Sequence, residues 1–239
     1  MSQWAGILVL VLLFAVIVGM FTLVFTVSAR GRRKDAHVRE DHAQLARIAA
    51  ERGWTYETRT QGRIDQYCGL RPFPARGSNL RAWHYTAGEF RGRRFTYFEY
   101  RYMNVTSGAD TGERKQPTIE SVFVVTTPGP GPFLQILRPS VLDTLFDRRP
   151  KMKLGVPEFD QNFRIITEDE EFVRSALCDT VVPYLLMSTK SKKSPLQLRN
   201  SELFTWYRGT LSPRTVDEKL NHLCDVLDRI PEHAWRTAV

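Results

Sequence analysis

The chain has 239 residues and a formal net charge of +8, from 34 basic and 26 acidic residues. None of these charges lies in the first 29 residues, and the rest is long enough for one packed domain. The cysteines Cys68, Cys178 and Cys224 are far apart and form no CxxC, which excludes a zinc ribbon and a thioredoxin-type motif. We expect three reduced thiols, and a basic surface that attracts anions of any kind.

The N-terminus is predicted to cross a membrane. Residues 5–27 (AGILVLVLLFAVIVGMFTLVFTV) are uncharged, and 16 of these 23 are Leu, Ile, Val or Phe. At about 1.5 Å per residue, a helix of this length spans a hydrocarbon core of about 30 Å. The alternative is a cleaved signal peptide ending at Val27-Ser28-Ala29. Residues 1–4, the expected external leader, carry no basic side chain, and the apolar core is longer than a signal peptide needs.

Residues 28–34 are predicted to be a basic juxtamembrane segment. It contains Arg30, Arg32, Arg33 and Lys34, whereas the other flank of the apolar segment has no charge. The positive-inside rule therefore places the N-terminus outside and the C-terminal domain in the cytoplasm of a single-pass protein of the cell membrane. We expect the four basic side chains to contact anionic lipid headgroups.

Residues 35–230 are predicted to form one soluble α+β domain that opens with a helix over 35–52, which Gly53 terminates. His37 and His42 lie five residues apart on it, a spacing that does not put both on one face, so we expect surface histidines rather than metal ligands. A loop with a helical turn near 64–67 separates the first of three expected strands from a hairpin. These strands are Trp54–Arg59, Arg81–Gly88 and Arg93–Met103.

The hairpin's second strand lies in a stretch, RGRRFTYFEYRY, where basic residues alternate with aromatic ones. Such a mix occurs on nucleic-acid platforms and also on ordinary strands. Glu99 places a negative charge in the middle of a supposed RNA surface, and the RNA-recognition pattern is not matched. We therefore expect a structural strand. Side chains alternate between the two faces of a strand. The face with Thr96, Phe98, Tyr100 and Tyr102 is expected to cover a core. The face with Tyr97, Glu99 and Arg101 is expected to be half exposed.

The middle of the chain is predicted to alternate between loops and strands. Asn104–Gln116 is polar and is expected to be a loop, Thr118–Thr127 a central strand, and Pro128–Pro132 (PGPGP) a turn that cannot join a ladder. Phe133–Arg138 and Phe163–Thr167 are further expected strands. A short helix is expected over Ser140–Asp147.

The last third is predicted to be mainly helical. Thr167 and Glu170 form a capping box before a helix that Pro183 ends or kinks. After a pair of short strands, Leu196–Leu198 and Leu203–Tyr207, Ser212 caps a final helix with Pro213 in its first position. Residues 231–239 are expected to be a mobile tail.

The sequence contains no Walker loop, GxGxxG, GxSxG, HExxH or EF-hand pattern. His84 is the histidine expected to be semi-buried, and His222 and Cys224 are two residues apart on a helix, which argues against a shared metal. Glu158 and Asp160 are expected to cap or solvate a turn while the neighbouring phenylalanines pack. We assign no catalytic, cofactor-binding or metal-binding residue.

Three segments resemble uncharacterised single-pass membrane proteins of actinobacteria. They are Gly53-Trp54-Thr55-Tyr56, the strand from Gly88 through Tyr102, and the segment from Glu158 through Ile165 before an acidic helix start. The resemblance covers most of residues 35–190. It implies an anchored α+β domain of unknown function and supplies no catalytic residues.

These observations predict an N-terminal transmembrane helix followed by an α+β domain, in which about three helices cover an antiparallel or mixed sheet of five to seven strands. We expect a non-catalytic interaction or binding module with an unknown protein partner. One alternative is an enzyme acting on a membrane-proximal or anionic substrate, with His84 and Asp160 or another acid in a polar pocket. Nucleic-acid binding through Tyr97 or Arg101 is a third, less favoured, reading.

Overall fold

The computed structural model describes Met20 and residues 35–108, 112–138, 151–177, 179–188 and 194–236, with the side chains of 105–114 left out. The predicted leader (1–4), the predicted transmembrane helix (5–27, apart from Met20), the basic segment (28–34) and the helix expected over 140–147 lie outside these residues. Among the residues described, no helix has both the length and the apolar character to cross a membrane. The chain divides into two compact units, Met1–Ala43 and Gln44–Val239.

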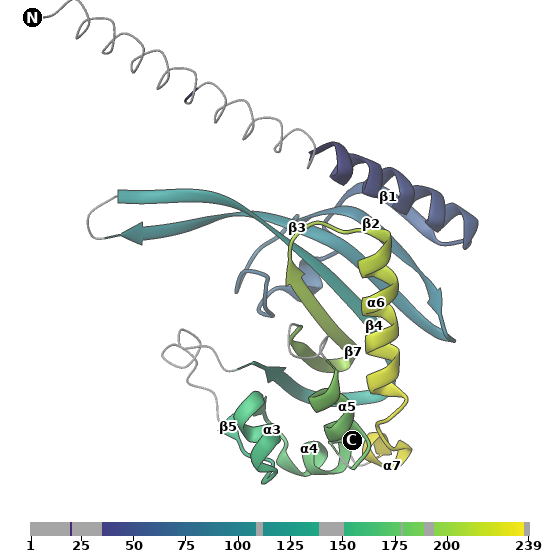
Figure 1. Cartoon of the computed structure of the whole chain (residues 1–239), viewed down its shortest axis with the longest axis vertical. Helices are drawn as coiled ribbons and strands as arrows, with labels where there is room; N and C mark the ends of the chain where they lie inside the picture. The colour runs from purple at the N-terminus through teal and green to yellow at the C-terminus, as the bar shows by residue number, and fades with distance from the viewer. Residues whose placement is uncertain are drawn as a thin grey trace, which may run out of the picture. The chain divides into compact units, whose positions relative to one another are not determined.

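The second unit is built on one sheet of seven strands in which every neighbouring pair is antiparallel (Figure 1). The strand order is β1-β2-β3-β4-β6-β5, and β7 pairs with β4. The sheet confirms the predicted α+β class and the upper limit of the predicted strand number. The strands are β1 (Thr55–Gln61), β2 (Arg81–Phe90), β3 (Arg93–Gly108), β4 (Gly112–Leu137), β5 (Lys151–Met152), β6 (Arg164–Thr167) and β7 (Leu196–Arg208).

The β2–β3 connection confirms the predicted hairpin. Arg91 and Gly92 both have positive φ, 53° and 74°, as a tight two-residue turn between antiparallel strands requires. The β3–β4 connection differs from the prediction, because strand pairing continues from Phe95 opposite Val125 out to Gly108 opposite Gly112. The segment expected to be a loop, 104–116, therefore contributes to both strands. Its polar side chains suggested a loop, but a strand pair is held by backbone groups that every residue except proline supplies in full.

The longest strand, β4, passes through the segment that was predicted to be a turn. Pro128–Pro132 lies inside β4, so that prediction is wrong, although the pairing with β7 shifts on both sides of Gly131. The shift has a physical cause, because proline donates no backbone hydrogen bond to a ladder. Gly131 pairs with Asn200, whose φ of 54° marks the irregularity in β7. As a result β7 is one bent strand rather than the two short strands expected.

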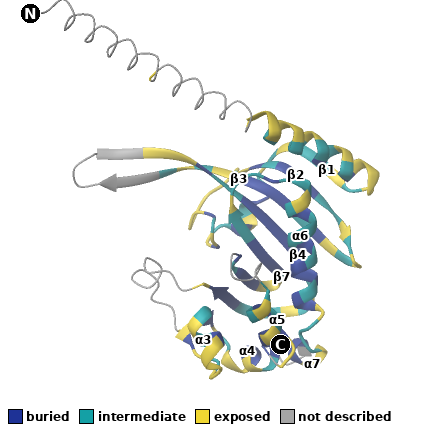
Figure 2. Cartoon of the chain, viewed as in Figure 1, coloured by how far each residue is buried: buried dark blue, intermediate teal, exposed yellow. Residues whose placement is uncertain are grey.

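Two apolar clusters cover the two faces of the sheet, and β3 alternates between them. Phe95 and Tyr97 belong to the larger cluster, whereas Phe98 and Tyr100 belong to the smaller one beneath the loop that contains η1 (Asp65–Tyr67). Figure 2 shows the central strands as largely buried. The face of Tyr97 and Glu99 was expected to be half exposed. Both side chains are instead fully buried, because helices cover this face as well.

Six α-helices lie within the described ranges, twice the number expected. Residues 35–51 form the first, and Gly53 with φ of 68° terminates it as predicted. The long helix α6 runs along one face of the sheet (Figure 1), with contacts to β3, β4 and β7. The remaining bounds are α3 (Pro157–Asn162), α4 (Glu170–Ala176), α5 (Val181–Met187), α6 (Pro213–Leu227) and α7 (Glu232–Arg236).

The start of α4 corrects the predicted capping box. Asp169, not Thr167, is the N-cap, and its carboxylate accepts the backbone N–H of Phe172 at 2.9 Å. Thr167 lies two residues earlier, where its hydroxyl accepts the N–H of Asp169. Pro183 was expected to end or kink this helix. It is instead the third residue of a separate helix, α5, where an N–H would have no partner within the helix.

The C-terminal elements partly agree with the sequence. Ser212 caps α6 and Pro213 is its first residue, as predicted. Residues 231–236, for which a mobile tail was expected, contain α7 and bury Ala234 and Trp235 in the larger apolar cluster. Trp235 meets Phe172 of α4 edge-on, with ring centroids 5.7 Å apart. This segment therefore completes the core.

Candidate functional site

A buried carboxylate lies at the centre of the sheet. Glu99 of β3 has no exposed surface, and one carboxylate oxygen accepts the backbone N–H of Leu211 at 2.9 Å. The other oxygen accepts Nε and Nη2 of Arg101 at 3.0 and 2.6 Å. Side chains two residues apart on a strand share a face, which is why Arg101 reaches Glu99. The carboxylate therefore joins β3 to the chain just before α6.

His84 lies beside this carboxylate because β2 contains a bulge. The pairing of β2 with β3 shifts between Trp83 and Thr86, and His84 has a φ of 53°. The hydroxyl of Tyr56 is 2.7 Å from His84 Nδ1, and a ring nitrogen of His84 lies within 4.8 Å of a Glu99 oxygen. Burial raises the pKa of Tyr56 above its ordinary value. The sequence predicted a semi-buried His84, which is 8% exposed, and did not predict the burial of its neighbour Glu99.

The enzyme alternative named Asp160 or another acid beside His84, and the structure places Asp160 elsewhere. Asp160 lies in α3, where its carboxylate accepts the backbone N–H groups of Leu154 and Gly155 at 2.9 and 3.0 Å. Phe159 and Phe163 pack with ring centroids 4.8 Å apart. The first finding confirms that Asp160 caps a turn, and the second confirms that the two phenylalanines pack. The acid beside His84 is Glu99, whose oxygens hold Leu211 and Arg101.

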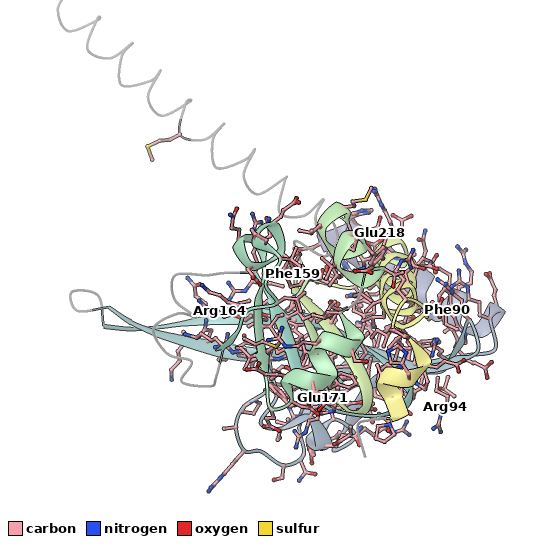
Figure 3. The ribbon with its side chains drawn as sticks, turned by 90° about the horizontal axis from the view of Figure 1, so that it is seen from below. Phe90, Arg94, Phe159, Arg164, Glu171 and Glu218 are labelled. Carbon is pink, nitrogen blue, oxygen red and sulfur yellow. The ribbon has the colours of Figure 1, made fainter. Side chains whose placement is uncertain are left out.

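A second polar cluster joins the β2–β3 turn to α6. Arg91 donates to Asp225 at 2.8 Å and to Asp228 at 2.6 Å, and Arg93 donates to Asp228 at 2.8 Å. Figure 3 places Phe90, the residue before this turn, beside α6. These ion pairs are partly exposed, so water screens them and each contributes little stability on its own. Together they fix the turn against the helix.

His222 extends this cluster into the interior, and the sequence did not predict its burial. It is 1% exposed, and its Nδ1 lies 3.0 Å from the hydroxyl of Tyr184, which also contacts Asp225 at 3.4 Å. Burial, reinforced by the Asp225 charge, raises the pKa of Tyr184 to about 12. Cys224 is buried and its thiol faces the Phe90 carbonyl, whereas His222 contacts Tyr184. Helical spacing could have shown that His222 neighbours the apolar stripe.

An indole surrounded by arginines lies on the outer strands of the sheet. The guanidinium carbons of Arg59 and Arg101 lie 5.2 and 4.6 Å from the ring centroid of Trp83. Arg59 pairs directly with Trp83 in the β1–β2 register, and Arg81 precedes Trp83 by two residues on β2. We call Arg59, Arg81, Trp83 and Arg101 the arginine–tryptophan cluster.

The comparisons with known proteins bear on the fold. No family model matches the sequence, and no curated protein matches it. One solved structure does share the architecture. It is the mycobacterial trehalose monomycolate transport factor A, TtfA, with a TM-score of 0.56 over 81% of this chain and 96% of that chain, at 13% sequence identity. At this identity the likeness shows the fold alone, and its mycobacterial source is consistent with the actinobacterial resemblance.

The structure tests some of the predicted sites and leaves others as predictions. The headgroup contacts Arg30, Arg32, Arg33 and Lys34 lie outside the described residues. Tyr97, named for the nucleic-acid alternative, is fully buried and has no face available for a base. A concave surface of about 570 Å³ is lined by residues that include Ala87, Thr96 and Val124 and the charged Glu89, Arg94 and Glu202. Among the residues that the structure describes, none of the predicted site residues lines this surface.

Proposed function

We propose that this chain is a membrane-anchored, non-catalytic interaction module that serves the transport of an amphiphilic cargo. The observation that carries the proposal is the fold shared with a transport factor, which extends over 96% of that protein and 81% of this one. The name of that protein refers to the transport of trehalose monomycolate, a glycolipid. We propose cargo of the same amphiphilic kind here, without assigning the particular molecule.

The internal polar groups support a scaffold role. Glu99 is held by Leu211 and Arg101, and Asp225 and Asp228 are held by the arginines of the β2–β3 turn. In each case a charged group fixes one element of the fold against another. Such a rigid body is suited to presenting surfaces to a partner, and its strongest charge pairs stabilise the architecture that presents them.

The proposed setting is the inner face of the cell membrane. Residues 5–27 would cross the bilayer, and Arg30, Arg32, Arg33 and Lys34 would contact anionic headgroups on the cytoplasmic side. Protease added to intact cells would then leave the domain intact and degrade it only after the cells are opened. Degradation in intact cells, or recovery of the chain from culture fluid, would contradict this orientation.

The interaction role is tested by purifying the tagged full chain from the membranes of its own cells in a mild nonionic detergent. We expect a membrane transport protein to co-purify in a fixed ratio. A variant with Met103, 55% exposed on β3, replaced by Glu would be compared with one carrying the same change at Met187, 84% exposed on α5. Loss of the partner from either variant, with the other unaffected, would map the interface. A chain that purifies without any partner in fixed ratio, or that turns over a glycolipid, would refute the proposal.

A further inference from the structure

The arginine–tryptophan cluster carries more positive charge than its neighbourhood neutralises. Arg59 and Arg81 are exposed, and within the described ranges neither forms an ion pair with a carboxylate. The acid nearest in sequence, Glu57, is engaged by Arg63 at 2.8 Å. Arg59 lies over the Trp83 ring and Arg81 lies two residues before Trp83 on β2, and both side chains are exposed.

Arg101 adds a third guanidinium that is held in place. Its Nε and Nη2 donate to the buried oxygen of Glu99, while about a third of its side chain is exposed. The contact with Glu99 already fixes the orientation of the Arg101 guanidinium. Its remaining N–H groups can therefore bind an anion with little further loss of conformational entropy. Trp83 supports this arrangement because Arg59 and Arg101 both lie over its ring.

We propose that the arginine–tryptophan cluster binds the phosphate of an anionic phospholipid headgroup. Guanidinium groups match phosphate oxygens with two parallel hydrogen bonds, and an indole among cationic side chains is typical of the membrane–water interface. A nucleic acid is a poorer occupant, because the guanidiniums lie where a base would stack on Trp83, and Tyr97 is buried. The inference rests on the proposed membrane setting and names a second lipid contact beyond residues 28–34.

The test uses the full chain reconstituted in nanodiscs of phosphatidylcholine with three-tenths phosphatidylglycerol. The protein is then extracted in nonionic detergent, and the phosphatidylglycerol molecules retained by each chain are counted by native mass spectrometry. The test variant is Arg59→Gln with Arg81→Gln. The matched control is Arg76→Gln with Arg94→Gln, which removes the same charge from two other exposed arginines. All variants keep residues 28–34, so the predicted contacts there cancel in the comparison.

We expect the test variant to retain fewer phosphatidylglycerol molecules than the native chain, and the difference should be the lipid held at the arginine–tryptophan cluster, whose affinity falls by about tenfold or more since each arginine near an anionic surface contributes several-fold. The control should match the native chain, and Arg59→Lys with Arg81→Lys should recover part of the loss. Equal retention by the test and control variants would overturn the proposal. So would displacement of the lipid by 10 mM inorganic phosphate or by an oligonucleotide, because either would name a different ligand.

Failure of the proposed membrane anchoring can be told apart from failure of the headgroup inference. If the chain does not enter nanodiscs, the anchoring proposal fails, and the same proteins are instead sedimented with phosphatidylglycerol vesicles. The headgroup inference then predicts that a smaller fraction of the test variant sediments than of the native chain or the control variant. Failure of both proteins to sediment would refute the inference too.

Discussion

The role of Glu99 gives the sharpest test of the fold. Replacement by alanine removes the acceptor of three hydrogen bonds, one from the backbone of Leu211 and two from Arg101. Breaking a buried ion pair by removing one partner costs about 3–5 kcal/mol. Arg101 is 34% exposed and regains water, which lowers this cost, whereas the Leu211 N–H is left without its acceptor. We therefore expect Glu99→Ala to lower the free energy of unfolding by about 3–4 kcal/mol.

Glu99→Gln should cost less, about 1–2 kcal/mol, because an amide oxygen still accepts from Leu211 while the charge on Arg101 loses its counterpart. Thermal unfolding of the full chain in nonionic detergent measures both changes. For a domain of this size Glu99→Ala should lower the midpoint by about 6–15 °C. Glu57→Gln removes the exposed pair with Arg63 and should change stability by less than about 0.5 kcal/mol. Equal midpoints for Glu99→Ala and Glu57→Gln would refute the reasoning.

Three further predictions test packing and ionisation. A Cβ on Gly88 would lie 2.4 Å from a ring carbon of Trp54, so Gly88→Ala should cost about 1–3 kcal/mol, whereas Gly129→Ala, whose Cβ would meet nothing closer than 3.5 Å, should cost less. Trp235→Ala should cost about 3–5 kcal/mol by denaturant titration, and a change below 1 kcal/mol would show that α7 does not complete the core. Burial raises the pKa of Tyr97 to about 12. Its neutral form is therefore favoured by folding, so stability is complete below about pH 10 and falls as the pH rises towards 12; a fall that is unchanged in Tyr97→Phe would refute this assignment.

The elements that the sequence predicted well are those whose signals are local. The Arg91–Gly92 turn, the Ser212 cap with Pro213, and the Gly53 helix stop depend on backbone preferences within a few residues, and all three are found. The His84 burial followed from its place between aromatic residues on a strand. In each case one residue type meets a steric or hydrogen-bonding need of its own segment.

The wrong predictions concern features that depend on contacts between segments far apart in the sequence. Polarity and proline suggested breaks at 104–116 and 128–132, but pairing with partner strands carries β3 and β4 through them. Glu99 was predicted to be half exposed because the hydrogen bond that accompanies its burial comes from Leu211, 112 residues away in the sequence. The burial of Trp235 depends likewise on α4. No pattern within a short window contains these long-range contacts.

The pairing of β4 has a consequence for how the protein is made. Glu120 of β4 pairs with Arg208 of β7, and β4 binds β3 along its first part and β6 along its last. During synthesis β4 therefore leaves the ribosome with one flank covered by β3 and the other without its neighbour until translation has passed residue 208. Closure over so long a loop is slow. For that interval the nascent chain carries an unprotected apolar edge, which is the stage at which chaperones would be most needed.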